Sequence, residues 1–442
     1  MSQQKLNQET DAQLALLGGP AAITRELPAW PLVEEADRRA LLEVIESKTW
    51  GGYHETVGEF ERRFAAYHGA SHGIALANGT LSLEIALIAS GIRPGDEVIV
   101  PPITFVASAS AIARVGAIPV FVDIDPQTIN LDPAAVAEAI TERTRAMMVV
   151  HFAGCPADLD SLAALGERHG LVMIEDCAHA HGAEWRGQRV GSFGAFGSFS
   201  FQASKNMTAG EGGMLITNDA ELAERARAIS NQGRRSGGAW YEHATLGTNA
   251  RLTGFQAAIL LNQLDRLPEQ VATRARSAAR LSEGLAGIDG LTPTPESLDE
   301  RATAHAWHIF SMKFDEQAFD GVPRQRIVEA LLAEGLPATL GYPQPIYHNE
   351  LFRPQPHVVH ACPEAEDYCR WPRPFRSSSI TSRSFASAWP IRMRPLAVRR
   401  APRSRWSAGA APINFTGRAT GPIRTTTSTP PPGPISGRWR RL

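Results

Sequence analysis

Short apolar runs alternate with segments of helical period between about Trp50 and Asp219. The runs are rich in Val and Ile, and this alternation predicts a three-layer α/β fold. Several runs are apolar on both faces, as expected of strands in a mostly parallel sheet that helices cover on both sides. The predicted strands are residues 72–78, 97–102, 117–124, 145–152, 171–176, 197–201 and 213–218.

The segments between these runs carry apolar residues three and four positions apart, which predicts helices. A long helical stretch follows from about Thr253 to Gly287, and Pro268 is expected to kink it. Beyond Gly290, a strand-like and a helix-like segment indicate the start of a smaller α/β domain. The remaining predicted helices are residues 80–90, 106–116, 132–140, 158–170, 220–233 and 323–335, and the late strand is residues 305–314.

The length of 442 residues exceeds what a single core usually accommodates, so we expect two domains. The charge of the chain is also unevenly distributed. No Asp or Glu occurs after Asp367, whereas fifteen Arg and no Lys occur from Arg370 onward. The predicted divisions are an N-terminal arm at 1–30, a large domain at 31–288 that includes the long helix, a partial small domain at 289–369 and a tail at 370–442.

The Arg-rich tail allows two explanations. Rich in Ser and Pro and without a sustained period, it is not expected to form a packed core. A basic tail can bind nucleic acid or another anionic surface. A frameshift in GC-rich DNA, which favours codons for Arg, Pro, Ser and Ala, explains the abrupt change in composition better. Since the whole chain has a formal charge of −2, the body before the tail carries about −17, which argues against nucleic acid as its partner.

The chain carries no pattern of a membrane protein. No run approaches the roughly 20 apolar residues of a membrane helix, and the N-terminus is polar without a signal-peptide pattern. We therefore expect a cytoplasmic protein without a membrane partner. The cysteines form no CxxC pair and no zinc-like spacing, so we expect reduced thiols at Cys155, Cys177, Cys362 and Cys369.

The segment SFQASKNMTAGEGG, residues 200–213, places Lys205 on a short turn between two predicted strands. Small neighbours on a tight turn allow a lysine to be held in a cavity rather than solvated. Desolvation lowers the proton affinity of an amine, which a lysine needs in order to form a Schiff base with an aldehyde. By itself, the pattern is more typical of a solvent-exposed lysine in a loop.

The segment IEDCAHAHG, residues 174–182, places Asp176 directly after a buried strand. A carboxylate at the carboxyl end of such a strand lies where α/β sheets bind ligands. It can keep a pyridine nitrogen protonated, so that the ring acts as an electron sink. A helix cap or a buried salt bridge would account for Asp176 alone. His179 and His181 are conceivable metal ligands, but no third ligand has a matching spacing, and we expect no metal.

Two further segments suggest contacts to a flat, phosphorylated ligand. In ANGTLSLEIAL, a strand leads through Asn-Gly into Thr80 and a helix, and free N–H groups at a helix start can cradle a phosphate. A plain capping turn has the same residues. In PPITFVASAS, Phe105 follows a strand, where its ring can stack on a cofactor or pack in the core.

The order of these four features, rather than any one of them, indicates a pyridoxal-phosphate site built along one sheet. The chain resembles the DegT/StrS family of sugar and aminocyclitol aminotransferases, which have the aspartate-aminotransferase fold, called fold type I of pyridoxal-phosphate enzymes. The resemblance covers roughly residues 25–368. It rests on NGTLSLEIAL, GDEVIVPPITFVASASAI, GAIPVFVDID, IEDCAHAHGA, SFSFQASKNMTAGEGG and GTNARLTGFQAAILLNQL.

The resemblance implies roles for the residues that match the family's motifs. The lysine at position 205 holds the cofactor and then shuttles a proton, and Asp176 pairs with the pyridine nitrogen. Phe105 stacks on the ring, and His179, often Gln in relatives, lies close to the cofactor hydroxyl. The positions expected at the cofactor phosphate are Thr80, the backbone of Leu81, Ser200 and, from the neighbouring subunit, Asn249, which implies a homodimer with shared active sites.

The implied reaction is a two-step transfer of an amino group. Glutamate or glutamine gives its amino group to the cofactor, which passes it to a nucleotide-linked keto-sugar or a keto-cyclitol such as an inosose. His rather than Gln at position 179 resembles members that act on carbocycles. Tyr342, Tyr347 and His348 are candidates for lining the substrate pocket, although aromatic packing would also explain each of them.

Two other functions fit the same fold. A sugar dehydratase of this fold replaces the lysine with histidine, whereas Lys205 is present here. A non-catalytic regulator could use the tail as an interaction arm, but no helix-turn-helix pattern supports it. The chain departs from the family after Asp367, where the acidic helices and the apolar strand that close the small domain are missing. This departure makes the small domain incomplete.

Overall fold

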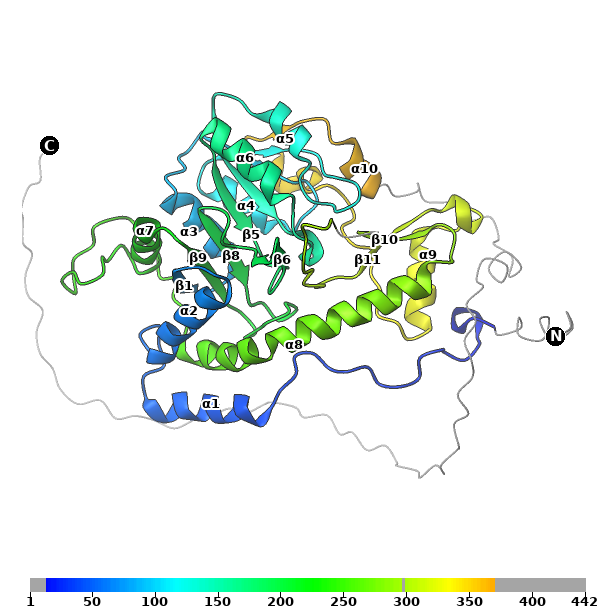
Figure 1. The fold of residues 1–442 in the computed structure, drawn as a ribbon, viewed down its shortest axis with the longest axis horizontal. Helices are drawn as coiled ribbons and strands as arrows, with labels where there is room; N and C mark the ends of the chain where they lie inside the picture. The colour runs from blue at the N-terminus through cyan, green and yellow to red at the C-terminus, as the bar shows by residue number, and fades with distance from the viewer. Residues whose placement is uncertain (1–12, 296–298, 370–442) are drawn as a thin grey trace, which may run out of the picture. The chain divides into compact units, whose positions relative to one another are not determined.

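An eight-stranded sheet forms the centre of the computed structural model, which describes residues 13–295 and 299–369 (Figure 1). Its strand order is β1-β9-β8-β5-β4-β2-β3-β12. Only β9 runs antiparallel to both of its neighbours, so the sheet is mostly parallel, as predicted. The strands are β1 (His72–Leu76), β2 (Glu97–Val100), β3 (Ile118–Phe121), β4 (Thr144–Val150), β5 (Val172–Asp176), β8 (Phe196–Ser200), β9 (Gly213–Thr217) and β12 (Val358–Val359).

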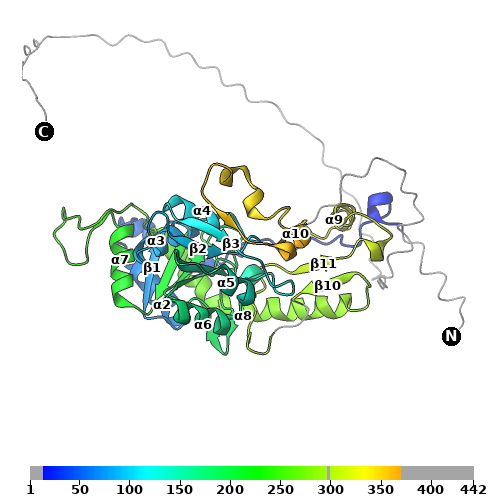
Figure 2. The same cartoon turned by 90° about the horizontal axis from the view of Figure 1, so that it is seen from above.

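Helices cover both faces of the sheet because successive residues of each strand point to opposite faces. In β4, for example, Met147 and Val149 contribute to one apolar core, and Ala146 and Met148 to the other. Figure 2 shows α3 (Gly79–Ala89) and α4 (Ala107–Arg114) on one side of the strands. The helices α5 (Pro133–Ala139), α6 (Leu159–His169) and α8 (Gly254–Leu285) lie on the other side. This arrangement confirms the predicted three layers.

The long helix α8 continues through Pro268 without interruption. It contacts α2 (Glu55–Tyr67) and α1 (Glu35–Ser47), which precede the sheet in the chain. The connection to α1 includes an ion pair in which Arg266 lies 3.0 Å from the buried Asp37. The other described helices are α7 (Ala220–Ser230), α9 (Arg324–Ala333) and α10 (Pro363–Cys369), and none of the helices described has both the length and the apolar character to cross a membrane.

The predicted strand at 305–314 is wrong over its first six residues. Only β11 (Ser311–Phe314) is a strand, paired with β10 (Leu291–Thr294). Before it, Ala306 and His308 donate their N–H groups to Gly154 and Ala153 at 3.0 and 2.9 Å, and Trp307 has a positive φ of 46°. Alternating side chains suggested an extended strand, but these residues instead form an irregular segment against the end of the sheet.

The last described residues contact the large sheet. β12 pairs with β3 in parallel, although its two residues are too few for the sequence to predict it. The buried Asp123, just after β3, accepts the N–H groups of Glu364 and Ala365 at 3.0 Å each and so caps α10. The chain divides into two units, Met1–Ile391 and Arg392–Leu442, and all described residues belong to the first. The tail at 370–442 and residues 1–12 of the N-terminal arm lie outside the described residues.

Candidate active site

Asp176 ends β5 and is 6% exposed. Its Oδ2 accepts a hydrogen bond from Ser108 Oγ at 2.8 Å, and its Oδ1 accepts the Ala178 N–H at 3.1 Å. Thr104 Oγ1 lies 3.0 Å from Ser108 Oγ, so the Thr104 hydroxyl can donate to Ser108 while Ser108 donates to Asp176. Among the described residues Asp176 forms no ion pair within 4.0 Å, which excludes a buried salt bridge as its explanation there. Two neutral donors, the Ser108 hydroxyl and the Ala178 N–H, therefore hold the carboxylate of Asp176 at the end of β5.

Lys205 lies on the loop that follows β8, where its backbone N–H donates to Gln202 at 2.9 Å. The loop is anchored beside the lysine, since Asn206 Nδ2 donates to the backbone oxygen of Ala306 at 2.7 Å. Burial lowers the pKa of the Lys205 amine below its ordinary value, while the charge of Asp176 raises it. Lys205 is therefore partly buried, and its amine interacts electrostatically with the carboxylate of Asp176.

His179 is buried at 7% exposure, and its ring lies 4.4 Å from that of His308. Burial lowers the pKa of His179 well below its ordinary value, and the charge of Lys205 lowers it further. The ring is therefore neutral at physiological pH, and its buried Nδ1 has no hydrogen-bond partner among the described residues. A buried polar atom without a partner is unfavourable, which suggests that a ligand supplies the missing contact.

The start of α3 packs directly against the end of β8. A Cβ on Gly79 would lie 2.7 Å from Cβ of Ser200, so only glycine fits between Asn78 and Thr80. The N–H of Leu81 donates to Oδ1 of Asn78 at 2.9 Å, which is the geometry of a helix cap. The structure thus brings Thr80, Leu81 and Ser200 together, and their role toward a phosphate stays a prediction.

Phe105 is 58% exposed, which excludes core packing as its explanation. It lies between β2 and α4, and its carbonyl accepts the N–H of Ser108 at 3.2 Å. Since Ser108 in turn donates to Asp176, the backbone of Phe105 is linked to the carboxylate through Ser108. A flat ligand that contacts Asp176 could cover this ring.

The other residues predicted at the site, Tyr342, Tyr347, His348 and Asn249, make different contacts. The ring of Tyr342 lies 6.1 Å from that of Phe152, and the pKa of Tyr342 is raised by burial and further by the charge of Asp176. Tyr347 Oη instead donates to Glu366 at 2.6 Å, and His348 lies 3.2 Å from the same carboxylate. Asn249 is exposed and pairs through its backbone with Asn231.

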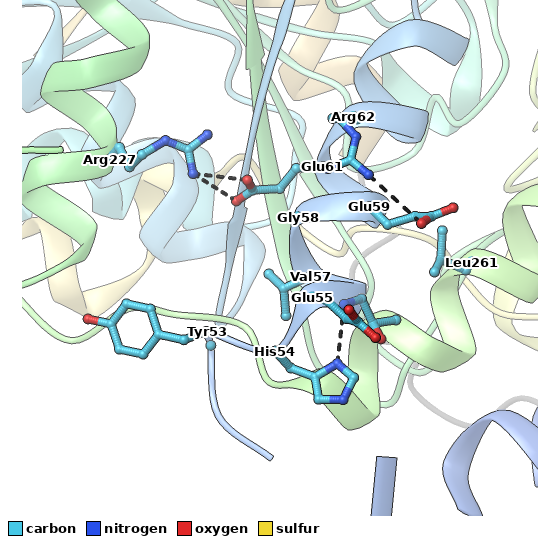
Figure 3. Close-up of a pocket in the computed structure, with 12 residues that line it drawn as sticks. Tyr53, His54, Glu55, Val57, Gly58, Glu59, Glu61, Arg62, Arg227 and Leu261 are labelled. Carbon is cyan, nitrogen blue, oxygen red and sulfur yellow. Dashed lines mark hydrogen bonds and ion pairs between the residues drawn. The ribbon is translucent and has the colours of Figure 1, made fainter. Parts of the chain in front are cut away.

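A cavity of about 570 Å³ lies elsewhere, at the start of α2 (Figure 3). Arg227 and Leu261 contribute to its lining together with residues 52–59, but Lys205 and Asp176 do not. Its two arginines already have partners, since Arg227 lies 2.9 Å from Glu61, and Arg62 lies 3.8 Å from Glu59. The cavity therefore offers no unpaired cation to a ligand.

Sequence reasoning missed two contributors to the site. Ser108 lies inside the quoted motif PPITFVASAS, yet its spacing from Phe105 did not reveal its contact with Asp176. His308 lies in the segment wrongly predicted as a strand, and its Nδ1 is 3.3 Å from Oδ1 of Asn206. Burial lowers the pKa of His308 to about 3, with Lys205 and Arg274 adding to the fall.

The set of side chains fits pyridoxal phosphate. It combines a desolvated amine at Lys205, a fixed carboxylate at Asp176 and an unpartnered ring nitrogen at His179. These are the groups needed to bond an aldehyde, hold a pyridine nitrogen in its protonated form and contact a hydroxyl. A Cβ at position 79 would lie 2.7 Å from Ser200 Cβ, so α3 begins without a side chain at the place where a phosphate is expected.

Comparisons with known proteins agree with this geometry. Residues 31–371 match the sequence model of the DegT/DnrJ/EryC1/StrS aminotransferase family. The chain is 43% identical over 358 residues to the L-glutamine:2-deoxy-scyllo-inosose aminotransferase of Micromonospora echinospora, covering 77% of this chain and 84% of that protein. It is 43% identical over 332 residues to the 3-amino-5-hydroxybenzoate synthase of Amycolatopsis mediterranei (strain S699), covering 74% and 84%. A crystal structure of 3-amino-5-hydroxybenzoic acid synthase superimposes with a TM-score of 0.73 at 39% identity, covering 79% of this chain and 92% of that one.

Proposed function

The chain belongs to the DegT/DnrJ/EryC1/StrS aminotransferase family, a family of pyridoxal-phosphate transaminases, and we propose that it transfers the amino group of glutamine to a keto-cyclitol. The nature of the acceptor is supported by relatives named for inososes at 43% identity. His179, at a position that often carries Gln in the family, is compatible with a carbocyclic acceptor. A nucleotide-linked keto-sugar remains the second acceptor class to test.

The observation that carries the proposal is the electrostatic coupling of Lys205 and Asp176. A partly buried amine with a lowered pKa on the loop after β8 and a buried carboxylate held by neutral donors at the end of β5 come from neighbouring strands of one sheet. A binding protein has no need of an electron sink, so this pair favours catalysis over a purely regulatory role. When bound, pyridoxal phosphate supplies the aldehyde that takes up the amino group and the ring that stabilises negative charge.

The residues of this chain then have separate tasks. Lys205 Nζ, whose pKa is lowered by burial, would act as the base that accepts a proton from the donor carbon and passes it on within the same half of the reaction, and would make the reverse transfer in the second half. The Asp176 carboxylate supplies the fixed negative charge that keeps a ring nitrogen protonated. His179 remains neutral and offers its free Nδ1 to a hydroxyl. Phe105, whose side chain is 58% exposed, is expected to stack on the ring of the bound cofactor.

The proposal includes a homodimer in which Asn249 completes the site of the partner. Asn249 follows a loop with exposed aromatic and aliphatic side chains, among which Trp240 is 77%, Tyr241 78% and Leu246 94% exposed. Exposed apolar residues of this size support contact with another protein surface. Light scattering should give twice the mass of the chain, and Asn249→Ala should weaken cofactor binding without separating the dimer.

The proposed function is tested by absorbance spectra of the purified protein with added pyridoxal phosphate. The wild type should show the visible band of a lysine-bound cofactor, and glutamine should convert it to a shorter-wavelength band. Lys205→Ala should lose both signals. Lys313→Ala removes an exposed lysine from β11 and should retain both signals. A folded wild type without the visible band would refute the proposal.

A further inference from the structure

Trp30, in the segment before α1, donates a hydrogen bond to the loop that carries Lys205. Its indole Nε1 donates to the backbone oxygen of Ala203 at 3.1 Å, two residues before the lysine. Ala203 and the following Ser204 are exposed, so core packing does not hold this part of the loop. The bond joins positions 173 residues apart in the chain, and it is therefore a tertiary contact rather than part of the turn.

Asn206 anchors the loop on the other side of the lysine. It is 3% exposed, and its Nδ2 donates to the backbone oxygen of Ala306 at 2.7 Å. Between the two anchors, the N–H of Lys205 donates to the backbone oxygen of Gln202 at 2.9 Å, inside the turn. A bond inside the turn fixes its shape but not its place relative to the sheet. Trp30 and Asn206 join the turn to distant segments, one on each side of the lysine.

The segment that carries Trp30 is itself fixed at both ends. The side chain of Glu334, directly after α9, accepts the N–H of Ala22 at 2.8 Å, and its backbone oxygen accepts that of Ile23 at 2.9 Å. At the other end, Glu34 lies 3.1 Å from Arg266 of α8. In Figure 1, this blue segment runs from α9 along α8 to α1. The indole can therefore hold the lysine loop, because its own backbone is held elsewhere.

A contact with α8 restrains the indole ring. The guanidinium carbon of Arg274 lies 5.2 Å from the ring centre of Trp30, and a cation is attracted to the face of an aromatic ring. The ring is 37% exposed, so packing by apolar neighbours covers it only in part. The contact with Arg274 favours one orientation of the ring and, with it, one direction of the N–H group.

We propose that Trp30 is a positioning residue, which fixes the loop of Lys205 through its hydrogen bond to Ala203. This inference rests on the role proposed for Lys205. A proton transfer requires the amine within reach of the reacting carbon, and a small displacement of a positioned group lowers the rate strongly. Trp30 acts through the loop and not on a substrate. Loss of the bond should therefore lower kcat and leave the KM for glutamine nearly unchanged.

The pKa of the Lys205 amine reports the position of the loop directly, because burial lowers it. A less firmly held loop exposes the amine to water, and its pKa should rise toward the ordinary value of about 10.4. Trp30→Phe keeps an aromatic ring but removes the N–H. A neutral hydrogen bond contributes about 2- to 10-fold, so the midpoint should rise by about 0.3 to 1 pH unit.

The midpoint is measured on the cofactor-free protein by brief acylation with acetic anhydride across pH, followed by mass spectrometry of the Lys205 peptide. Trp50→Phe is the matched control, since the exposed indole of Trp50 donates to the backbone oxygen of Ile45 at 3.2 Å, and its midpoint should stay in place. Trp30→His should restore the wild-type midpoint, because Nε2 of an imidazole has the same ring position as Nε1 of an indole. An unchanged midpoint in Trp30→Phe, an equal rise in Trp50→Phe, or no recovery in Trp30→His would overturn the proposal.

Steady-state kinetics of the cofactor-loaded enzyme give a second, independent readout. In Trp30→Phe, kcat with glutamine should fall about 2- to 10-fold at an unchanged KM. A rise in KM without a fall in kcat would assign Trp30 to substrate binding and overturn the positioning role. If the wild type forms no visible band with pyridoxal phosphate, the proposed function fails. The acylation midpoint still tests Trp30 in that case, because it requires neither cofactor nor substrate.

Discussion

Ser108 donates its hydroxyl hydrogen to Oδ2 of Asp176 over 2.8 Å and thereby joins the first turn of α4 to the end of β5. The second oxygen of Asp176 is held by the N–H of Ala178. Both donors are neutral, so they orient the carboxylate without compensating its charge. The charge of Asp176 in turn raises the pKa of Lys205, against the effect of burial, which lowers it.

We expect Ser108→Ala to lower kcat about 10- to 100-fold while leaving the KM for glutamine nearly unchanged, since a hydrogen bond to a charged group contributes about 1.5–3 kcal/mol. The reason is that Ser108 orients Asp176 and does not face the donor. Ser110→Ala is the matched control, because Ser110 Oγ contacts only the backbone oxygen of Ala107, at 3.4 Å, on the same helix. Steady-state kinetics measure kcat and KM for both variants. An equal fall of kcat in Ser108→Ala and Ser110→Ala would contradict the orienting role of Ser108.

The reactivity of Lys205 should depend on pH in a defined direction. Burial lowers its pKa, so the midpoint for its modification should lie below the ordinary lysine value of about 10.4. Asp176 raises this pKa in the wild type, and Asp176→Asn should therefore shift the midpoint to lower pH. Borohydride trapping with pyridoxal phosphate across pH, followed by mass spectrometry of the peptide, measures it. Glu211→Gln, which removes an exposed carboxylate from the same loop, should leave the midpoint in place, and an upward shift in Asp176→Asn would refute the argument.

The buried His68 should make the protein sensitive to acid. Burial, with a smaller contribution from the charge of Arg189, lowers its pKa to about 3, against about 6.5 in the unfolded chain. Its contribution to stability is therefore complete above pH 6.5 and is lost as the pH falls toward 3, at up to roughly 1.4 kcal/mol per pH unit. Its ring lies 4.4 Å from that of Phe199, so His68→Phe should fit an aromatic environment.

Urea unfolding at pH 7.5 and at pH 5 tests this dependence. The drop in the unfolding midpoint between the two values should be smaller in His68→Phe than in the wild type. His169→Gln, which replaces an exposed histidine in the last turn of α6, should show the wild-type drop. An unchanged drop in His68→Phe would mean that other groups control acid stability.

Gly79→Ala should weaken cofactor binding. The new Cβ would lie 2.7 Å from Ser200 Cβ, and overpacking of this kind costs about 1–3 kcal/mol, or roughly a 5- to 100-fold loss in affinity if it acts at the site. Gly284→Ala is the control, since no atom lies within 4 Å of a Cβ built there, and an alanine inside α8 should stabilise the helix by about 0.5–1 kcal/mol. Titration with pyridoxal phosphate separates the two, and wild-type affinity in Gly79→Ala would contradict the proposed phosphate cradle.

The periodicity of the chain predicted most of the fold because it records which side of each element is buried. β4 shows this directly, since Met147 and Met148 point into different cores. Periodicity gave a wrong prediction at residues 305–310, where the alternation of His305 and Trp307 with apolar neighbours resembled a strand. There the backbone bonds to Ala153 and Gly154, more than 140 residues earlier, outweigh the local preference for extended structure.

The sequence by itself determined the order of the strands and helices, and the motifs that carry Asp176, Lys205 and Phe105. Only the tertiary structure decided that burial lowers the pKa of Lys205 and that Ser108 orients Asp176. The physical reason is that burial of a charge and the identity of its partner depend on segments far apart in the chain. Periodicity tells which face of a helix is covered, whereas the fold alone tells what covers it.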